Sequence, residues 1–419
     1  MRKAWLPFLL AVAWAQGVDL KALVQGSPGF QDLEAERNQA RLSLEAARAG
    51  LLPTLAPQGS YSRASTGQES LSLGVGGGFP LLPWGPAQDA LQAAERAYRQ
   101  ALLDLRAQEN ALFLRVLSQY LEAYLAGLDL AVAQKALELR EAQLQAVEAQ
   151  YARGQATFQA LLEAQTNQAQ AQAEVLGAES ALSLARARLQ ATLGTQVEPL
   201  PLPLPQVLPS LEEALAALER RPDVQKARLA LEEAEALLAQ ARRDRYLPSV
   251  NLGVSLAEGQ AGLEVRLDLK AGQLGYSLLL YPGRSQSLAS FQLQANLPLF
   301  QPSQDAALSL REEAVERARR ALANALVAAE LDLKAKHQAL RQAQSRLEVA
   351  ARGLKAAESA LDTARKRLAA GTGTPLEVKQ AEFNLLQAQR SWEGAKAAFL
   401  QAYYALLEAM GESFLGGEK

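Results

Sequence analysis

The chain has 419 residues, of which 49% are hydrophobic, 21% charged and 6% aromatic, and its formal net charge is −2. It has no Cys and a single His, which excludes a Cys/His zinc site, an iron–sulfur cluster, a disulfide framework and most nucleophile–His pairs. The balanced charge lacks the basic excess of a nucleic-acid-binding domain. We therefore expect no catalytic residues, no metal, no bound cofactor and no nucleic-acid partner.

The N-terminal residues 1–15 have the features of a secretory signal peptide. A basic start at residues 1–3 precedes an apolar run at 4–12, and Ala-Trp-Ala at 13–15 fits an A-x-A cleavage site. A short buried N-terminal helix is the alternative. No later run of about 18 uncharged apolar residues occurs, so we expect no helical membrane span in the mature, exported chain.

The mature chain passes twice through one order of elements: helix, strands, very long helix, turn and long helix. Matched residues recur at a constant offset of 217, as from Gly154 to Gly371 and from Asn167 to Asn384. This pattern indicates a structural duplication. We expect one intertwined domain made from a first repeat at 16–198, a Pro-rich connector at 199–209, a second repeat at 210–411 and a C-terminal tail at 412–419.

Two blocks, at about 54–82 and about 249–299, have the alternation of strands. In Ser70-Leu71-Ser72-Leu73 the period of two gives one apolar face and one polar face. The second block is the longer, from an added hairpin or from longer strands and loop. Aromatic residues near the block ends are candidates for the membrane interface, with ordinary hairpin packing as the alternative. They are Tyr61, Phe79, Trp84, Tyr281 and Phe300.

Each strand block leads into a very long helix, at 86–151 and at 302–368. These segments have no internal Pro after their first residue and almost no Gly, so at 1.5 Å per residue each helix is about 100 Å long. A partner helix follows each turn, at 157–193 and at 375–410. The basic run at 242–245 ends a shorter helix, and we interpret it as complementing that helix's dipole.

The turn between the helices of each hairpin is a candidate contact surface, because a partner protein meets a hairpin end first. Glycines at the turns suit a C-terminal helix stop, and Thr or Pro suits the start of the next helix. Two acids near the turns, Glu163 and Glu377, are candidates for a gate or a cation-selecting ring, with solvated helix acids as an equal alternative. The expected contact residues are Tyr151, Arg153, Gly154, Thr157, Gly371, Thr374 and Pro375.

The strands are too few for one chain to close a barrel. We expect about two in the first block and two to four in the second, whereas the smallest membrane barrels have about eight. Each unpaired backbone group in lipid costs several kcal/mol. If these strands enter a membrane, several chains must share one barrel, and helices of about 100 Å must project beyond a hydrocarbon layer of about 30 Å.

The chain resembles the TolC family of outer-membrane efflux channels, the outer membrane efflux proteins. The resemblance lies in the duplicated order, the helix ends Leu52-Pro53-Thr54 and Leu247-Pro248-Ser249, the Pro298-Leu299-Phe300 element, and the turns Tyr151-x-x-Gly154 and Leu368-x-x-Gly371. It implies a mainly α fold with a small β part. Long antiparallel hairpins would form a periplasmic α-barrel, and the strands would enter a 12-stranded β-barrel of a homotrimer in the cell outer membrane.

The resemblance also implies a passive exit duct for small molecules or polypeptides, and not an enzyme. Its partners would be outer-membrane lipid and a periplasmic adaptor of an inner-membrane efflux pump or type I secretion system. The turns depart from the family pattern at Ala160 and Gly373, so we expect different gate contacts, with Arg153, Glu163 and Glu377 as candidates. A periplasmic adaptor protein and a structural coiled-coil protein of the envelope are the alternative functions.

Overall fold

The structure is a computed structural model that describes residues 19–63, 69–282, 286–297 and 300–416. The predicted signal peptide and the residues Pro298 and Leu299 lie outside the described residues. The chain divides into two compact units. The helical unit takes in Met1–Leu33, Arg106–Arg221 and Ala329–Lys419, and the sheet unit takes in Glu34–Leu105 and Pro222–Ala328.

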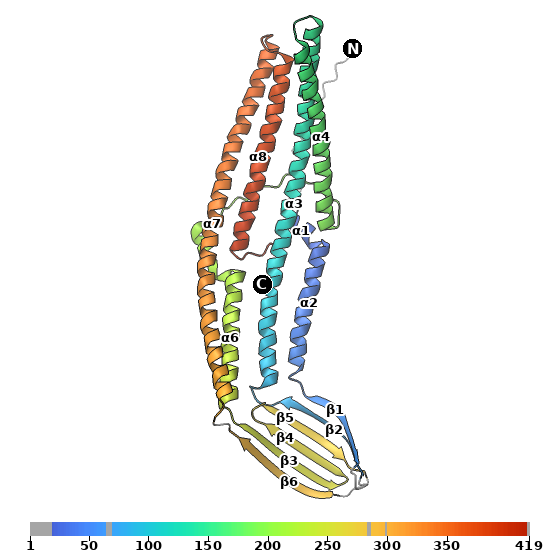
Figure 1. Cartoon of the computed structure of the whole chain (residues 1–419), viewed down its shortest axis with the longest axis vertical. Helices are drawn as coiled ribbons and strands as arrows, with labels where there is room; N and C mark the ends of the chain where they lie inside the picture. The colour runs from blue at the N-terminus through green and yellow to red at the C-terminus, as the bar shows by residue number, and fades with distance from the viewer. Residues whose placement is uncertain (1–18, 64–68, 283–285, 298–299, 417–419) are drawn as a thin grey trace. The chain divides into compact units, whose positions relative to one another are not determined.

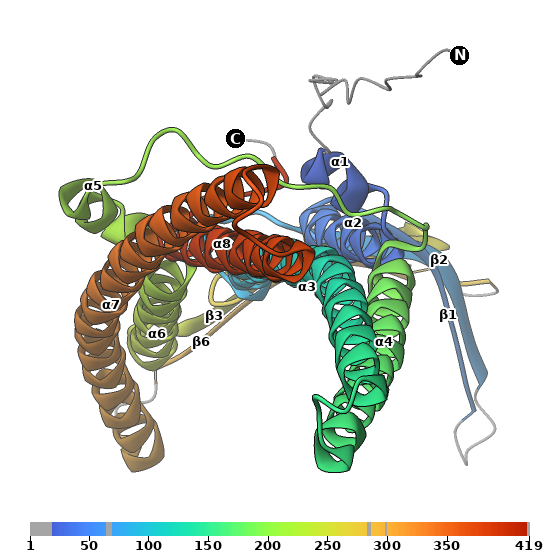
Figure 2. The same ribbon diagram turned by 90° about the horizontal axis from the view of Figure 1, so that it is seen from above.

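The helical unit consists of two antiparallel helix pairs with short helices beside them. In Figures 1 and 2, α4 lies alongside the second part of α3, and α8 lies alongside the second part of α7. The four long helices begin and end within one residue of the ranges expected from the sequence. The elements are α1 (Leu20–Gln25), α3 (Pro86–Ala152), α4 (Phe158–Leu193), α5 (Leu211–Ala216), the 3₁₀-helix η1 (Leu218–Arg220), α7 (Pro302–Ala369) and α8 (Pro375–Ala409).

An aromatic cluster forms part of the core of the helical unit. The Phe113 side chain, only 1% exposed, packs its ring 5.1 Å from Tyr404 and 4.9 Å from Phe414, measured between centroids. Asn110 Nδ2 donates to the carbonyl of Glu412 at 2.8 Å, and the Phe414 N–H donates to Asn110 Oδ1 at 3.2 Å. The segment that follows α8 is therefore packed against α3.

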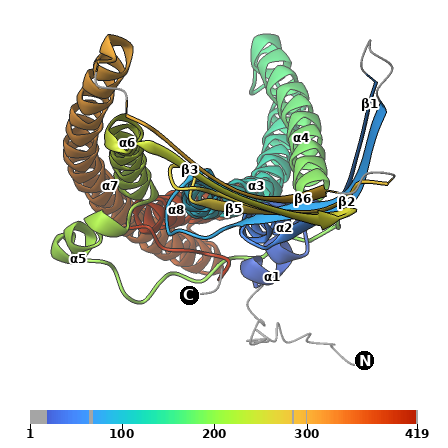
Figure 3. The same cartoon turned by 90° about the horizontal axis from the view of Figure 1, so that it is seen from below.

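The sheet unit contains one antiparallel sheet, most of α2, α6 and the first parts of α3 and α7 (Figure 1). The strand order is β1-β2-β5-β4-β3-β6. Seen from below, the sheet is bent rather than flat (Figure 3). The elements are α2 (Pro28–Ala49), β1 (Thr54–Arg63), β2 (Glu69–Pro80), α6 (Pro222–Tyr246), β3 (Ser249–Gly259), β4 (Ala261–Asp268), β5 (Gln273–Leu280) and β6 (Gln286–Asn296).

The extra length of the second strand block is an added hairpin, β4–β5. β3 pairs with β6 as β1 pairs with β2, and the added hairpin lies between β2 and β3. The described part of each chain thus has six strands, so three chains would supply 18 strands. A 12-stranded trimeric barrel, which the resemblance implies, needs four strands from each chain, two fewer than this sheet has.

Candidate functional site

One face of the sheet is apolar across all six strands, and we call it the apolar face. Side chains alternate between the two faces with a period of two, and the pairing register aligns the apolar ones. Many are exposed, including Leu278 at 54% and Phe291 at 68%. An apolar surface of this extent needs a covering partner or lipid. Its central members are Leu73, Val75, Leu278, Tyr276, Leu263, Val265, Leu252, Val254, Phe291 and Leu293.

The opposite face, the polar face, carries mostly small and hydrogen-bonding side chains, with Leu279 and Leu288 near the hairpin ends. The hydroxyl groups of Ser60 and Ser72 lie 2.8 Å apart, and those of Ser255 and Ser290 lie 2.5 Å apart. In the described strands, the charged residues of the polar face all lie on β4. They are Glu264, Arg266 and Asp268, in register with polar-face residues of β3 and β5.

The five predicted interface aromatics lie at the two ends of the sheet. Tyr61 and Tyr281 are near the hairpin ends, on β1 and directly after β5. Phe79, Trp84 and Phe300 are at the end where α3 and α7 begin. Tyr61 is 61% exposed and Phe300 is 83% exposed. Trp84 is partly buried, and its Nε1 donates a 2.9 Å hydrogen bond to a backbone carbonyl of the β4–β5 turn.

The two edges of the sheet are β1 and β6, each with one neighbouring strand among the described residues. Five antiparallel pairings separate them, so β1 and β6 run in opposite directions. An edge strand presents unpaired N–H and C=O groups to a further strand. β1 of one sheet and β6 of another copy are therefore oriented for antiparallel pairing.

The last turn of α6 contacts the first turns of α3 and α7. Arg243 pairs with both carboxylate oxygens of Asp89, with Nη1 3.1 Å from Oδ1, and Arg245 Nε donates to Asp305 Oδ1 at 2.6 Å. Asp89 and Asp305 occupy matching positions in the two repeats. The helix-dipole interpretation of this basic run missed these partners. The repeated Asp was the signal in the sequence that could have indicated them.

The first hairpin tip, between α3 and α4, is closed by local contacts. Gly154 has φ of 72°, in the left-handed region that favours glycine. The Thr157 hydroxyl caps α4 by accepting the N–H three residues on, at 3.1 Å. Arg153 Nε donates to the carbonyl four residues earlier, at 2.9 Å. The rings of Tyr151 and Phe158, 6.5 Å apart and both exposed, leave an aromatic surface at this tip.

The second tip, between α7 and α8, has a full capping box. Gly371 has φ of 74° and Pro375 begins α8. Thr374 Oγ1 accepts the N–H of Glu377 at 3.2 Å, and Glu377 Oε2 accepts the N–H of Thr374 at 3.5 Å. The carboxylate of Glu377 thus stabilises the helix start, a role that the sequence interpretation overlooked although the pattern T-x-x-E indicates it.

The other gate candidates are not joined to Glu377. Glu163 lines a groove that also includes Arg140 and Leu376. Throughout the part of the chain that the structure describes, no ion pair connects Arg153, Glu163 and Glu377 with one another. The charged contacts between the two hairpins involve other residues.

Ion pairs join α3 to α8 within the helical unit. Arg390 binds Asp129 with two hydrogen bonds, Nε to Oδ1 at 2.5 Å and Nη2 to Oδ2 at 2.9 Å. Glu382 lies 3.2 Å from Lys135 Nζ of α3 and 3.2 Å from Arg365 Nη2 of α7. The Arg390–Asp129 and Lys135–Glu382 contacts, which we call the hairpin ties, link the α3–α4 hairpin to the α7–α8 hairpin, whereas the Arg365–Glu382 contact lies within the second hairpin.

The contacts of Glu382 with Lys135 and Arg365 favour its charged form. Burial raises the pKa of its carboxyl group, but the hydrogen bonds from Lys135 and Arg365 outweigh burial and lower the pKa below the ordinary 4.5. The unfolded chain therefore binds this proton more readily than the folded chain. The contacts of Glu382 with Lys135 and Arg365 stabilise the folded hairpins above pH 4.5, and this contribution is lost as the pH falls through the lowered pKa of Glu382.

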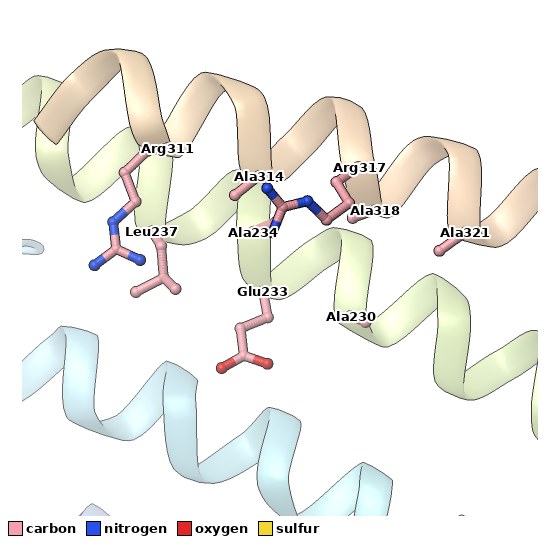
Figure 4. A pocket seen from close by; sticks show the side chains of 9 residues that line it. All are labelled: Ala230, Glu233, Ala234, Leu237, Arg311, Ala314, Arg317, Ala318 and Ala321. Atoms are coloured by element: carbon pink, nitrogen blue, oxygen red, sulfur yellow. The ribbon is translucent and has the colours of Figure 1, made fainter. Parts of the chain in front are cut away.

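A shallow groove lies between α6 and α7 (Figure 4). Glu233 and Leu237 come from α6, Arg311 and Arg317 come from α7, and the rest of the lining is alanine. No group of three metal-ligating side chains occurs among the described residues. In the same residues, no helix is both long enough and apolar enough to cross a bilayer. The candidate functional surfaces are the sheet faces, the sheet edges and the hairpin tips.

Comparison with known proteins identifies the family. The model of the outer membrane efflux protein family matches the chain twice, over residues 20–195 and 215–412, which agrees with the duplication. No curated protein sequence matches the chain. The periplasmic adaptor and the coiled-coil envelope protein considered above do not account for the two family matches.

Several solved outer-membrane proteins have a similar fold. VceC from Vibrio cholerae is 21% identical with a TM-score of 0.69, covering 95% of this chain and 97% of that chain. The CmeC channel of Campylobacter jejuni is 17% identical with a TM-score of 0.71, covering 96% and 88%. The open MtrE channel of Neisseria gonorrhoeae is 22% identical with a TM-score of 0.65, covering 94% and 89%. The chain belongs to the outer membrane efflux protein family and is an outer-membrane efflux channel.

Proposed function

We propose that three copies of this chain form one passive exit duct and share a single β-barrel in the outer membrane. The observation that carries the proposal is the sheet, which has one apolar face, one polar face and two open edges of opposite direction. Pairing β1 of each copy with β6 of the next satisfies both edges. The apolar face then contacts lipid and the polar face lines the lumen.

The even number of strands supports closure between copies. With six alternating strands in each chain, every junction between copies is antiparallel, as in all the pairs within the chain. Barrels of about 16–18 strands are wide enough to leave an aqueous channel. Three chains with 18 strands would thus enclose a water-filled pore.

The long hairpins form the periplasmic part in this proposal. α3 has 67 residues and α7 has 68, so each is about 100 Å long at 1.5 Å per residue. A hydrocarbon layer of about 30 Å cannot contain them. We assign the two hairpin tips to contact with a periplasmic adaptor of an inner-membrane pump or secretion system, and the two repeats to one intertwined domain.

A duct of this kind moves solutes without transforming them. The energy comes from the partner pump, and the chain needs no catalytic group of its own. We accordingly propose a channel without enzymatic activity.

The subunit number of the purified protein tests the shared barrel. We expect the mature protein, extracted from outer membranes with detergent, to be a trimer by light scattering and a threefold tube in particle images. It should also conduct ions in planar bilayers. A detergent-solubilised monomer, or recovery of the mature protein as a soluble periplasmic species, would contradict the proposal.

Neutralising Glu163 and Glu377 together tests the proposed cation-selecting ring at the tips. Gln at position 377 can still serve in a capping box, so the double variant removes charge and keeps the start of α8. We expect a lower preference for cations, measured as the reversal potential across a salt gradient. Glu174→Gln, at an exposed position on α4, is the matched control. Unchanged selectivity in the double variant would exclude the ring.

A further inference from the structure

The β4–β5 hairpin is the part of the sheet that the duplication does not explain. The first repeat joins β1 to β2 directly, whereas the second inserts β4 and β5 between the equivalent strands β3 and β6. The turn of the insertion is bound to the end of α6 and to the segment between β2 and α3. Lys270 Nζ donates to the carbonyl of Asp244 at the end of α6, at 2.9 Å, and the carbonyl of Gly272 accepts the N–H of Leu81 at 2.8 Å.

The inserted strand β4 also carries the charges of the polar face. Glu264, Arg266 and Asp268 follow one another at a spacing of two, so their side chains share that face. The charged residues of the other described strands are Arg63, Glu69 and Glu258, which lie at hairpin ends in register with the apolar face. The charge of the polar face is therefore concentrated in one strand.

Arg266 lies between two glycines in the sheet. Its pairing partners are Gly253 on β3 and Gly275 on β5, and its side chain is 75% exposed. It pairs with the acid two residues earlier on its own strand, with Arg266 Nε 2.7 Å and Nη2 2.5 Å from Glu264 Oε1. Asp268 Oδ1 accepts the N–H of Ala271 at 2.8 Å, so this carboxylate is held at the turn end of the strand.

We infer that the Glu264–Arg266–Asp268 strand is the charge-selective element of the barrel lumen. The inference rests on the proposed function, in which the polar face lines a shared barrel. Three copies then place a band of charge around a wall whose other residues are uncharged, mostly Ser, Gly, Ala, Asn and Gln. Two acids and one base give each chain one net negative charge, so the band favours small cations, and Arg266 is the group that limits this preference.

Reversal potentials in planar bilayers test the inference. Arg266→Gln should raise the ratio of cation to anion permeability several-fold, and the double variant Glu264→Gln with Asp268→Asn should lower it several-fold. Both effects should grow as the salt concentration falls, because screening weakens. The matched control is Glu258→Gln, which removes an acid from the opposite face. We expect this variant to keep the permeability ratio of the unmodified channel. Wild-type ratios in both test variants, with normal conductance, would overturn the inference.

Thiol labelling gives a second readout that does not depend on selectivity. The chain has no Cys, so an introduced Cys is the only thiol. A membrane-impermeant, positively charged thiol reagent should change the current through Arg266→Cys and leave Val265→Cys, on the apolar face, unchanged. A conducting channel in which position 266 does not react, or in which both positions react equally, would contradict a lumenal β4. If the unmodified protein does not conduct, the proposed function itself fails.

Discussion

Val254→Arg is expected to prevent assembly of the channel in the outer membrane. Val254 lies near the middle of β3 on the apolar face, where it pairs with Val265 and Phe291. An Arg at the midplane of a barrel's lipid face costs about 2–4 kcal/mol, and three copies would cost about 6–12 kcal/mol together. The measurement is the amount of trimer recovered from the outer-membrane fraction, which should fall to a small part of the wild-type amount.

The matched control is the same change one residue along the strand. Ser255→Arg places the guanidinium on the polar face, where Ser255 pairs with Glu264 and Ser290. We expect normal recovery of trimer and an altered conductance. Equal loss of both variants, or normal insertion of both, would show that the two faces do not separate lipid from lumen.

Removing the bidentate hairpin tie is expected to favour the open channel strongly. Asp129 and Arg390 connect α3 to α8, so Arg390→Ala removes the bidentate one of the two ties between the hairpins and leaves the Lys135–Glu382 tie in place. A partly exposed pair contributes at most about 1 kcal/mol, and three copies moving together would change the open–closed free energy by about 3 kcal/mol. This corresponds to roughly a hundredfold change in the population ratio, because 1.4 kcal/mol is about tenfold. Mean conductance and open probability in planar bilayers measure it.

Two further variants distinguish the effect of losing this tie from the effect of losing a charge. The exchange of Asp129→Arg with Arg390→Asp should restore much of the wild-type closure. Lys366→Ala removes a charge from an intrahelical pair with Asp362 on α7 and should leave the conductance unchanged. If Arg390→Ala conducts as the wild type does, the tie does not hold the hairpins closed.

The hairpin tips show how far local sequence determines structure. Gly154 and Gly371 end helices with a positive φ, and Thr157 and Thr374 cap the helices that follow, as their positions predicted. Capping depends on neighbours within about four residues, so the sequence contains all the information needed. The role of Glu377 was equally local and could have been predicted from its spacing to Thr374.

The faces of the sheet were also predictable, but the neighbours of each strand were not. Alternation sorts residues such as Leu73 and Ser72 onto opposite faces of any sheet that they join. It does not determine whether the added hairpin lies beyond β6 or between β2 and β3. The position between β2 and β3 gives the order β1-β2-β5-β4-β3-β6 and places Arg266 beside two glycines.

The sequence by itself determined the duplicated elements, the ends of the long helices, the two faces of the strands and the family, because these depend on local spacing and composition. The tertiary structure decided the strand order and the charged contacts between elements. Arg390 pairs with a residue 261 positions away, and Arg243 with one 154 positions away. The chain contains many carboxylates that could pair with either Arg, and the sequence does not distinguish them. Only the packing of the helices brings one of them within hydrogen-bonding distance.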